Sequence, residues 1–276
     1  LSLDQCTRTN WYSLVELVIM QPQKQYKILL VGETCQDEYV YGDVDRISPE
    51  APIPVVKYIR TETSNGMSAN VKANLESLGV LVNHITNKNK IIKRRIVDRS
   101  SNQQLLRIDE EGDIDTLKVS EVKSAFIHMQ YDAIVISDYD KGYLSKNDLE
   151  VFCQNFNGPV FIDTKKTDLF TYPNVFFKIN QREYDRLIVK PDAKNLIVTL
   201  GEGGSVYDGQ VFPAERVNVF DVVGAGDTFL ATVAYAFLAT GDISTSIMIA
   251  NKASAIAVQN YGCYTLTSSD VECLIC

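Results

Sequence analysis

Short apolar runs that end in glycine or a polar residue recur along this chain. The first of them, KILLVG at 27–32, is typical of a buried parallel strand that leads into a ligand-facing loop. Runs of the same kind occupy 133–137, 160–163, 175–179 and 195–200. They predict the strands of a mostly parallel sheet.

Helical patterns separate these runs. We expect helices at 68–78, 120–129, 145–156, 229–240 and 243–261, several of them closed by a glycine. Alternation of strands and helices predicts an α/β fold whose sheet is covered on both faces. Ligands of such sheets bind outside the carboxyl ends of the strands. We therefore expect one rim to carry Gly32, Asp138, Asp163, Asn180, Gly201 and Asp227.

Two segments, 53–60 and 90–109, break this alternation. Both are rich in β-branched residues and have no long helix between them, so they are predicted to form antiparallel strands. A small sheet built from them could cover the rim. No internal repeat, low-complexity tract or Gly/Ser linker marks a second independent domain.

Composition narrows the class of protein. With 276 residues, 45% of them hydrophobic and 22% charged, the chain can bury a substantial core in one large domain or two small ones. A net charge of −8 argues against a nucleic-acid surface, because such binding depends on clustered Lys and Arg. The densest basic run, at 88–99, is interpreted as a solvated face.

The six cysteines are scattered, which indicates reduced thiols and a cytoplasmic protein. A C-x-x-C at 273–276 has no second ligand pair, and neither His84 nor His128 has zinc-ligand spacing. The apolar stretch 11–20 is shorter than the roughly 20 residues of a membrane span. We interpret 1–26 as an N-terminal extension, with a short helix packed on the domain or on a second subunit.

The segment 221–228, DVVGAGDT, is the strongest chemical signal. A glycine pair before a helix lets backbone N–H groups approach a ligand, and the helix dipole favours an anion there. Asp227 would then lie beside bound phosphate. The alternative is a tight turn with Asp227 as an N-cap. A dinucleotide-binding loop is disfavoured because Phe229 occupies its third glycine position, and no Walker-type phosphate loop occurs.

Three weaker motifs accompany it. Asn180 and Glu183 could meet phosphate and Mg²⁺-bound water in a first helical turn, or form an ordinary capping box. The turn TLGEGG at 199–204 could lie against a phosphorylated ligand, or simply make a hairpin into 205–207. The small residues of 64–70 could admit a hydroxyl-rich ligand beside Asn70, or cap a helix.

Taken in this order, the motifs resemble those of the ribokinase-like carbohydrate kinases, the PfkB family, over most of 27–270. The resemblance implies a three-layer α/β/α sandwich with a mostly parallel central sheet, and a small β lid from about 41–60 and 91–109 within a kinase domain at 27–276. Segments 41–56, 102–109, 137–142 and 163–165 are most similar to the D-glycero-D-manno-heptose 7-phosphate kinases of that family.

This resemblance implies an activity. These kinases phosphorylate the anomeric hydroxyl with ATP and Mg²⁺, giving the 1,7-bisphosphate on the route to ADP-heptose. In many bacteria the kinase is fused to an adenylyltransferase, for which we expect no room in these 276 residues. Exposed edges of the lid would invite a homodimer. The expected partners are ATP and a sugar phosphate, with neither nucleic acid nor membrane.

The resemblance also implies roles for individual residues. Asp227 would be the catalytic base, and the backbone of Gly224, Ala225 and Gly226 would stabilise the transferring phosphoryl group. The ATP site would comprise Asn180, Gln181, Arg182, Glu183, Thr199, Gly201, Gly204 and Asn251, with Glu183 holding Mg²⁺ through water. The acceptor site would comprise Asp37, Gly66 and Asn70, with Arg46, Lys93, Arg95, Arg107 and Lys141 for its phosphate.

The chain departs from the family pattern in places. Asn65 stands where glycine is usual, although Asn tolerates positive φ well. Asp140 and Lys166 also stand at frequent glycine positions. The interval between Gly79 and Lys93 lacks a further strand and helix, which are either absent or omitted. A kinase for another sugar or nucleoside, or a ligand-binding relative without catalysis, therefore stays open.

Overall fold

A mostly parallel sheet forms the centre of the molecule. We describe a computed structural model in which residues 24–120, 122–123 and 129–275 are placed. The strands β4, β1, β7, β8, β9 and β10 run parallel, and β11 and β12 continue the sheet antiparallel. The eight strands, in spatial order, are β12 (Gln210–Phe212), β11 (Ser205–Tyr207), β10 (Leu196–Thr199), β9 (Val175–Asn180), β8 (Val160–Thr164), β7 (Ala133–Asp138), β1 (Lys27–Gly32) and β4 (Leu81–Ile85).

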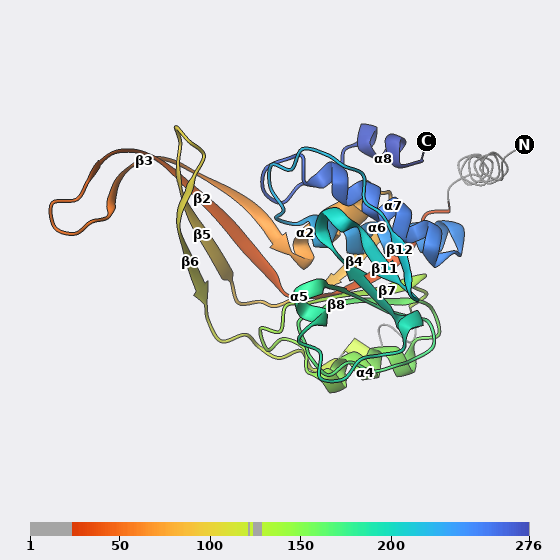
Figure 1. Ribbon diagram of the computed structural model, residues 1–276. Coiled ribbons are helices and arrows are strands. Elements are labelled where there is room, and N and C mark those ends of the chain that lie inside the picture. The colour runs from red at the N-terminus through yellow and green to blue at the C-terminus, as the bar shows by residue number, and fades with distance from the viewer. Residues whose placement is uncertain (1–23, 121, 124–128, 276) are drawn as a thin grey trace, which may run out of the picture.

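Helices cover both faces of this sheet (Figure 1). Because side chains alternate along a strand, Ile28 and Leu30 of β1 pack into one core with the long helices, while Leu29 and Val31 pack into another with α4. These layers confirm the α/β/α sandwich. The helices are α2 (Ser68–Ser77), α4 (Lys146–Asn155), α5 (Gln181–Tyr184), α6 (Ala225–Thr240), α7 (Ile243–Ala257) and α8 (Ser268–Ile275), with short 3₁₀ turns at Ala193–Asn195 and Gly201–Gly203.

The carboxyl ends of the central strands meet at one rim. Gly32 is in register with Ser137, Asp163 with Lys178, and Asn180 with Thr199. The strands that lead there are buried along their length because both of their faces are covered. The predicted rim is therefore present, and the polar residues that follow each strand are brought together.

A second sheet projects from the body (Figure 1), and we call it the lid sheet. The prediction of antiparallel strands at 53–60 and 90–109 is confirmed by the two hairpins, whereas the central strands β2 and β5, for which no pairing was predicted, run parallel. Their register places Asp37 beside Lys93 and Tyr39 beside Arg95. The lid strands, in spatial order, are β3 (Pro54–Met67), β2 (Thr34–Ile47), β5 (Ile91–Asp98) and β6 (Gln104–Glu111).

Several element boundaries differ from those expected. Helix α6 begins at Ala225 instead of 229, so the glycine motif is part of its first turn, and α7 ends at Ala257. The short interval after Gly79 holds β4, which the apolar pattern did not reveal, and leads straight into β5. The expected helix at 11–20, most of that at 120–129, His128 and Cys276 lie outside the described residues. Within the described part of the chain, no helix is long and apolar enough to span a bilayer.

Candidate active site

The glycine motif forms the amino-terminal turn of α6. Gly224 precedes the helix with φ 77°, a conformation that glycine adopts without strain. A methyl group at Gly224 would lie 2.6 Å from Asn70 Nδ2, so the close approach of α2 also requires glycine. Asp227 lies inside the first turn and makes no capping hydrogen bond. The alternative that Asp227 is merely an N-cap is therefore wrong.

The Asp227 carboxylate is buried and held from two sides. The Tyr139 hydroxyl donates to Oδ1 at 2.9 Å, and Asn70 Nδ2 donates to Oδ2 at 3.3 Å. Burial and the negative charge of Asp163 raise the pKa of Asp227 to about 6, against the opposing effect of Lys178. A carboxylate with a pKa near neutral is suited to act as a general base.

A chain of buried and half-buried charges lies beneath this turn. Lys178 Nζ is 2.6 Å from Asp163 Oδ2, and both side chains are 5% exposed. Lys165 bridges Asp163, at 3.3 Å, and Glu183, at 2.5 Å. Burial opposes the charge on Asp163, but Lys165 and Lys178 outweigh it and lower the pKa of that carboxyl. The network links Glu183 to the surroundings of Asp227.

The Asn180 to Glu183 motif is a complete capping box. Asn180 Oδ1 accepts from the Glu183 N–H at 3.0 Å, and Glu183 Oε2 accepts from the Asn180 N–H at 2.8 Å. Gln181 and Arg182 are exposed, and Gln181 Nε2 donates to Asp185. The structure therefore contains the capping box, and the role of this motif toward ATP and Mg²⁺ stays a prediction.

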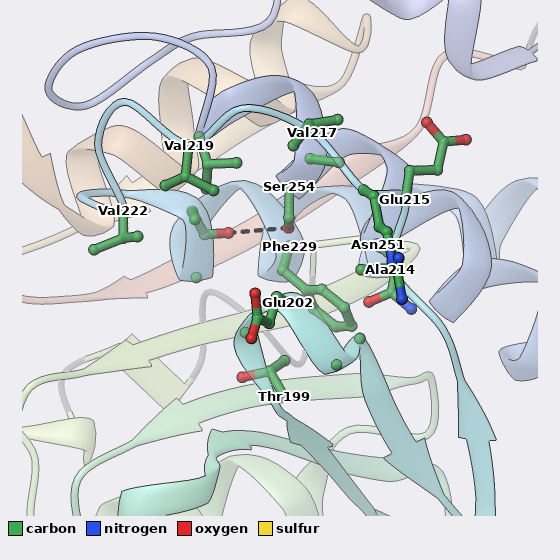
Figure 2. A pocket seen from close by; sticks show the side chains of 18 residues that line it. Thr199, Glu202, Ala214, Glu215, Val217, Val219, Val222, Phe229, Asn251 and Ser254 are labelled. Carbon is green, nitrogen blue, oxygen red and sulfur yellow. Dashed lines mark hydrogen bonds between the residues drawn. The ribbon is translucent and has the colours of Figure 1, made fainter.

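A cavity of about 670 Å³ opens on the other side of the turn (Figure 2). Thr199, Gly201, Gly204 and Asn251 all line it, together with Ala225 and Gly226, whereas residues 180–183 do not. Figure 2 shows Thr199 and Glu202 on one side, Val219 and Ser254 on the other, and Phe229 between them. Its volume is in the range of small-molecule sites.

Gly204 shapes the edge of this cavity. It has φ 86°, and a methyl group there would lie 2.0 Å from the Phe212 carbonyl oxygen. The turn that contains it leads from β10 into β11, so the predicted hairpin and the predicted ligand-facing loop are the same feature. Asn251 of α7 donates to the Phe212 carbonyl at 2.9 Å and fixes the far wall.

Asp37 is the centre of the predicted acceptor side. It is 3% exposed and accepts from Arg95 Nη1 at 2.5 Å. The Sγ atoms of Cys35 and Cys263 both lie 3.7 Å from its Oδ2. A methyl group at Gly66 would lie 2.1 Å from the same oxygen. Strand β2, the end of β3 and the segment after α7 therefore converge here.

The five basic residues predicted to bind the acceptor phosphate are not equivalent. Arg95 pairs with Asp37, Lys141 with Glu111 at 2.7 Å, and Arg107 with Asp109 at 2.8 Å. Arg46 is exposed on β2. Lys93 lies 5.3 Å from the centre of the Tyr139 ring, and no carboxylate within the described residues pairs with it. The structure therefore brings Lys93 close to the candidate base and leaves Arg46 on the lid surface.

The departures from the family pattern have local explanations. Asn65 does not use positive φ, and the strained residue is Met67, with φ 58°. Asp140 has φ 55°, and its Oδ1 lies 2.5 Å from Lys166 Nζ. The two residues that replace glycines thus pair with each other.

Sequence reasoning gave no role to Tyr139, Lys165 or Lys178. Tyr139 directly follows β7 and was marked only by its position at the rim. Lys178 occupies an alternate strand position to Asn180, so both side chains face α6. This spacing was the available signal for Lys178.

Comparisons with known proteins agree with this geometry. A ribokinase from Thermotoga maritima matches with a TM-score of 0.65 at 16% identity, covering 91% of this chain and 99% of that one. Phosphofructokinase-2 from Escherichia coli matches with a TM-score of 0.67 at 15% identity, covering 91% and 98%. These likenesses establish the ribokinase fold.

Residues 180–270, which hold the capping box, the cavity and the glycine motif, match the pfkB family carbohydrate kinases. Over these residues the chain is similar to a family of phosphotransferases. More particularly, it is 32% identical over 91% of its length to "Bifunctional protein HldE" of Campylobacter curvus, and 30% identical over 89% to the protein of the same name from a Nitratiruptor species. The chain spans 65% and 64% of those relatives.

Proposed function

We propose that this chain uses ATP to phosphorylate D-glycero-D-manno-heptose 7-phosphate at its anomeric hydroxyl, giving the 1,7-bisphosphate for ADP-heptose biosynthesis. The observation that carries the proposal is the position of Asp227. Its buried carboxylate lies at the glycine turn, between the cavity lined by Gly226 and the acceptor side around Asn70 and Asp37.

The reaction is an in-line displacement. Asp227 accepts the proton of the sugar hydroxyl, and the sugar oxygen forms a bond to the γ-phosphorus of ATP. The bond from that phosphorus to the β–γ bridging oxygen breaks, and ADP leaves with the electron pair. Backbone N–H groups of 224–226 and the dipole of α6 stabilise the negative charge of the transferring group.

Mg²⁺ would supply charge neutralisation at the phosphate oxygens. Glu183 has the oxygen ligands that this ion prefers, but Lys165 and the Asn180 N–H already engage its two carboxylate oxygens. The arrangement fits contact through a metal-bound water better than direct coordination. Thr199, Gly201, Gly204 and Asn251 would contact the nucleotide, and the exposed Gln181 and Arg182 would lie nearer solvent.

Choice of the heptose phosphate depends on the motif resemblance and on Lys93. A phosphate needs a cation that is not already neutralised, and Lys93 fits this requirement beside Tyr139. Arg95 would act by orienting Asp37 toward sugar hydroxyls. The lid sheet would close over the acceptor and exclude water from the reaction.

A second candidate is a kinase that acts on a sugar without a phosphate. The observation in its favour is that Arg95, Arg107 and Lys141 already have carboxylate partners. A neutral sugar would leave these pairs undisturbed.

We also propose a homodimer formed through the lid sheet. Large apolar side chains are exposed on its strands, including Tyr58 at 66% and Leu106 at 55%. The predicted cytoplasmic location is supported by free thiols at Cys35, Cys153, Cys263 and Cys273.

A coupled ADP-release assay tests the function. Heptose 7-phosphate, ribose, fructose and fructose 6-phosphate are compared at equal concentration, with a no-sugar control. We expect turnover to be fastest with the heptose phosphate. Faster turnover with ribose or fructose would favour the second candidate. ADP release that stays at the no-sugar rate with every acceptor would contradict both.

A further inference from the structure

Lys178 is a buried ammonium at an electrostatically unfavourable place. It is 4% exposed, and its side chain lies under the amino-terminal turn of α6. A methyl group built at Gly226 would be 2.7 Å from Lys178 Nζ. The amino-terminal end of a helix carries partial positive charge and repels a cation, and burying an ammonium costs several kcal/mol more.

Asp163 offsets part of this cost. Its Oδ2 accepts a hydrogen bond from Lys178 at 2.6 Å, and its Oδ1 accepts one from Lys165 at 3.3 Å. A lysine ammonium has three donors. Within the described residues, Asp163 is the one hydrogen-bond acceptor of Lys178. The remaining N–H groups are available on the side of the glycine turn, where Gly226 closely approaches the ammonium.

The geometry of strand β9 directs the Lys178 side chain toward the other residues of the site. Lys178 and Asn180 occupy alternate positions of β9 and therefore share the face toward α6. Asp163 lies on the same face of β8, in register with Lys178. The ammonium thus shares a strand face with Asn180 and lies beneath the turn that leads to Asp227.

We propose that Lys178 is a catalytic residue that donates a hydrogen bond to a non-bridging oxygen of the transferring phosphoryl group. This inference depends on the proposed phosphotransfer. Lys178 keeps its proton throughout, and Asp163 holds it in position. A preorganised cation stabilises charge at the transferring group without reorganisation during the reaction. A side chain at Gly226 would displace the ammonium.

The central test replaces the lysine with an apolar residue of similar length. Lys178→Met should lower kcat by about 10²–10³-fold, with the KM values for ATP and sugar changed much less. Lys178→Arg should restore part of the loss. Lys166→Met is the matched control, since Lys166 pairs with the buried Asp138 at 3.4 Å but does not contact the site. Its kcat should match that of the wild type.

A double variant separates catalysis from charge balance. Lys178→Met/Asp163→Asn removes both charges of the buried pair, so folding is protected even where the single variant is unstable. If Lys178 only neutralises Asp163, the double variant recovers activity, and the proposal is overturned. If Lys178 acts on the phosphoryl group, the double variant folds and stays impaired.

A binding measurement separates failure of this inference from failure of the proposed function. Thermal stabilisation by Mg·ADP is compared with and without tetrafluoroaluminate, an anion that mimics the transferring group. We expect tetrafluoroaluminate to add thermal stabilisation in the wild type and in Lys166→Met, and to add none in Lys178→Met/Asp163→Asn. This result does not depend on finding a sugar that supports turnover. Equal stabilisation of all three proteins would overturn the role of Lys178.

Discussion

The proposed acceptor side and the proposed nucleotide side of this site are built differently. Around Asp37 the structure uses buried ion pairs and polar side chains from distant strands, with Arg95 8% exposed and Asp37 3% exposed. The nucleotide cavity is formed by a glycine turn, small residues and apolar side chains such as Val219 and Val222, which are 56% and 68% exposed.

Each ligand would therefore be recognised in a different way. Fixed buried charges discriminate strongly, because a ligand that fails to satisfy them leaves unpaired polar groups. A cavity of backbone and apolar surface selects mainly by shape and tolerates side-chain changes. Substrate choice should therefore be sensitive to substitutions on the acceptor side, and nucleotide binding to backbone geometry.

The largest expected effect is at Asp227, where the two sides meet. Asp227→Asn should lower kcat by about 10²–10⁴-fold, because the sugar hydroxyl loses its base. Both KM values should change little, which steady-state kinetics with each substrate varied can check. A variant with unchanged kcat would contradict the assignment.

Stability and activity should respond to Asp227 in opposite directions. The pKa of Asp227 is raised from 3.8 to about 6. At a pH between these two values, the native state therefore holds a proton that the unfolded state has already lost. Stability from this group is thus lost as pH rises through about 6, while the active carboxylate form increases. At pH 8, Asp227→Asn should raise the free energy of unfolding by about 1–2 kcal/mol, measured by urea denaturation.

Arg95→Met tests the acceptor side. It leaves Asp37 buried without its partner, which should destabilise the fold by about 3 kcal/mol and raise the KM for sugar, with the KM for ATP unchanged. Arg94→Met is the control, because Arg94 pairs with the more exposed Glu38 and Glu110 and should cost less than about 1 kcal/mol. Equal losses in the two variants would remove the distinction between buried and surface pairs.

Gly204→Ala tests the nucleotide side. Its methyl group would meet the Phe212 carbonyl oxygen at 2.0 Å, so the turn must shift. We expect the KM for ATP to rise about tenfold, equivalent to about 1.4 kcal/mol, with the KM for sugar unchanged. Gly209→Ala has a similar positive φ but open space around it, so it should lower stability without changing either KM. A matching change in ATP binding at Gly209 would show general strain instead.

The last prediction concerns the support of the acceptor side. His84 Nε2 lies 2.9 Å from Ser68 Oγ at the start of α2, and burial, with a further contribution from Lys72, lowers its pKa from 6.5 to about 4. As pH falls, the His84 imidazole takes up a proton in the unfolded chain at a higher pH than in the native state. The stability that is present above pH 6.5 is therefore lost as pH falls toward 4. We expect a loss of about 1–2 kcal/mol between pH 7 and 5. His84→Gln should flatten that dependence in denaturation curves, and an unchanged slope would exclude His84 as its source.

Much of the fold could be predicted because its information is local. Continuous apolar runs identified β1, β7, β8, β9 and β10, since strands covered on both faces need no polar alternation. Strand β4 was missed because LVNHI is short and only partly apolar. The parallel pairing of β2 and β5 was missed because a pairing direction depends on the path of the chain between the strands, not on their composition.

Local sequence patterns predict the central sheet, the rim at its strand ends, and Asp227 with its glycine turn as the candidate centre of chemistry. The surroundings of that carboxylate become visible only in the folded chain. Tyr139 reaches it across 88 positions, Arg95 reaches Asp37 across 58, and Lys178 lies beneath Gly226. The physical reason is that periodicity and turn chemistry act over a few residues, whereas burial, which raises the pKa of Asp227 and fixes these ion pairs, exists only once distant strands and helices have packed together.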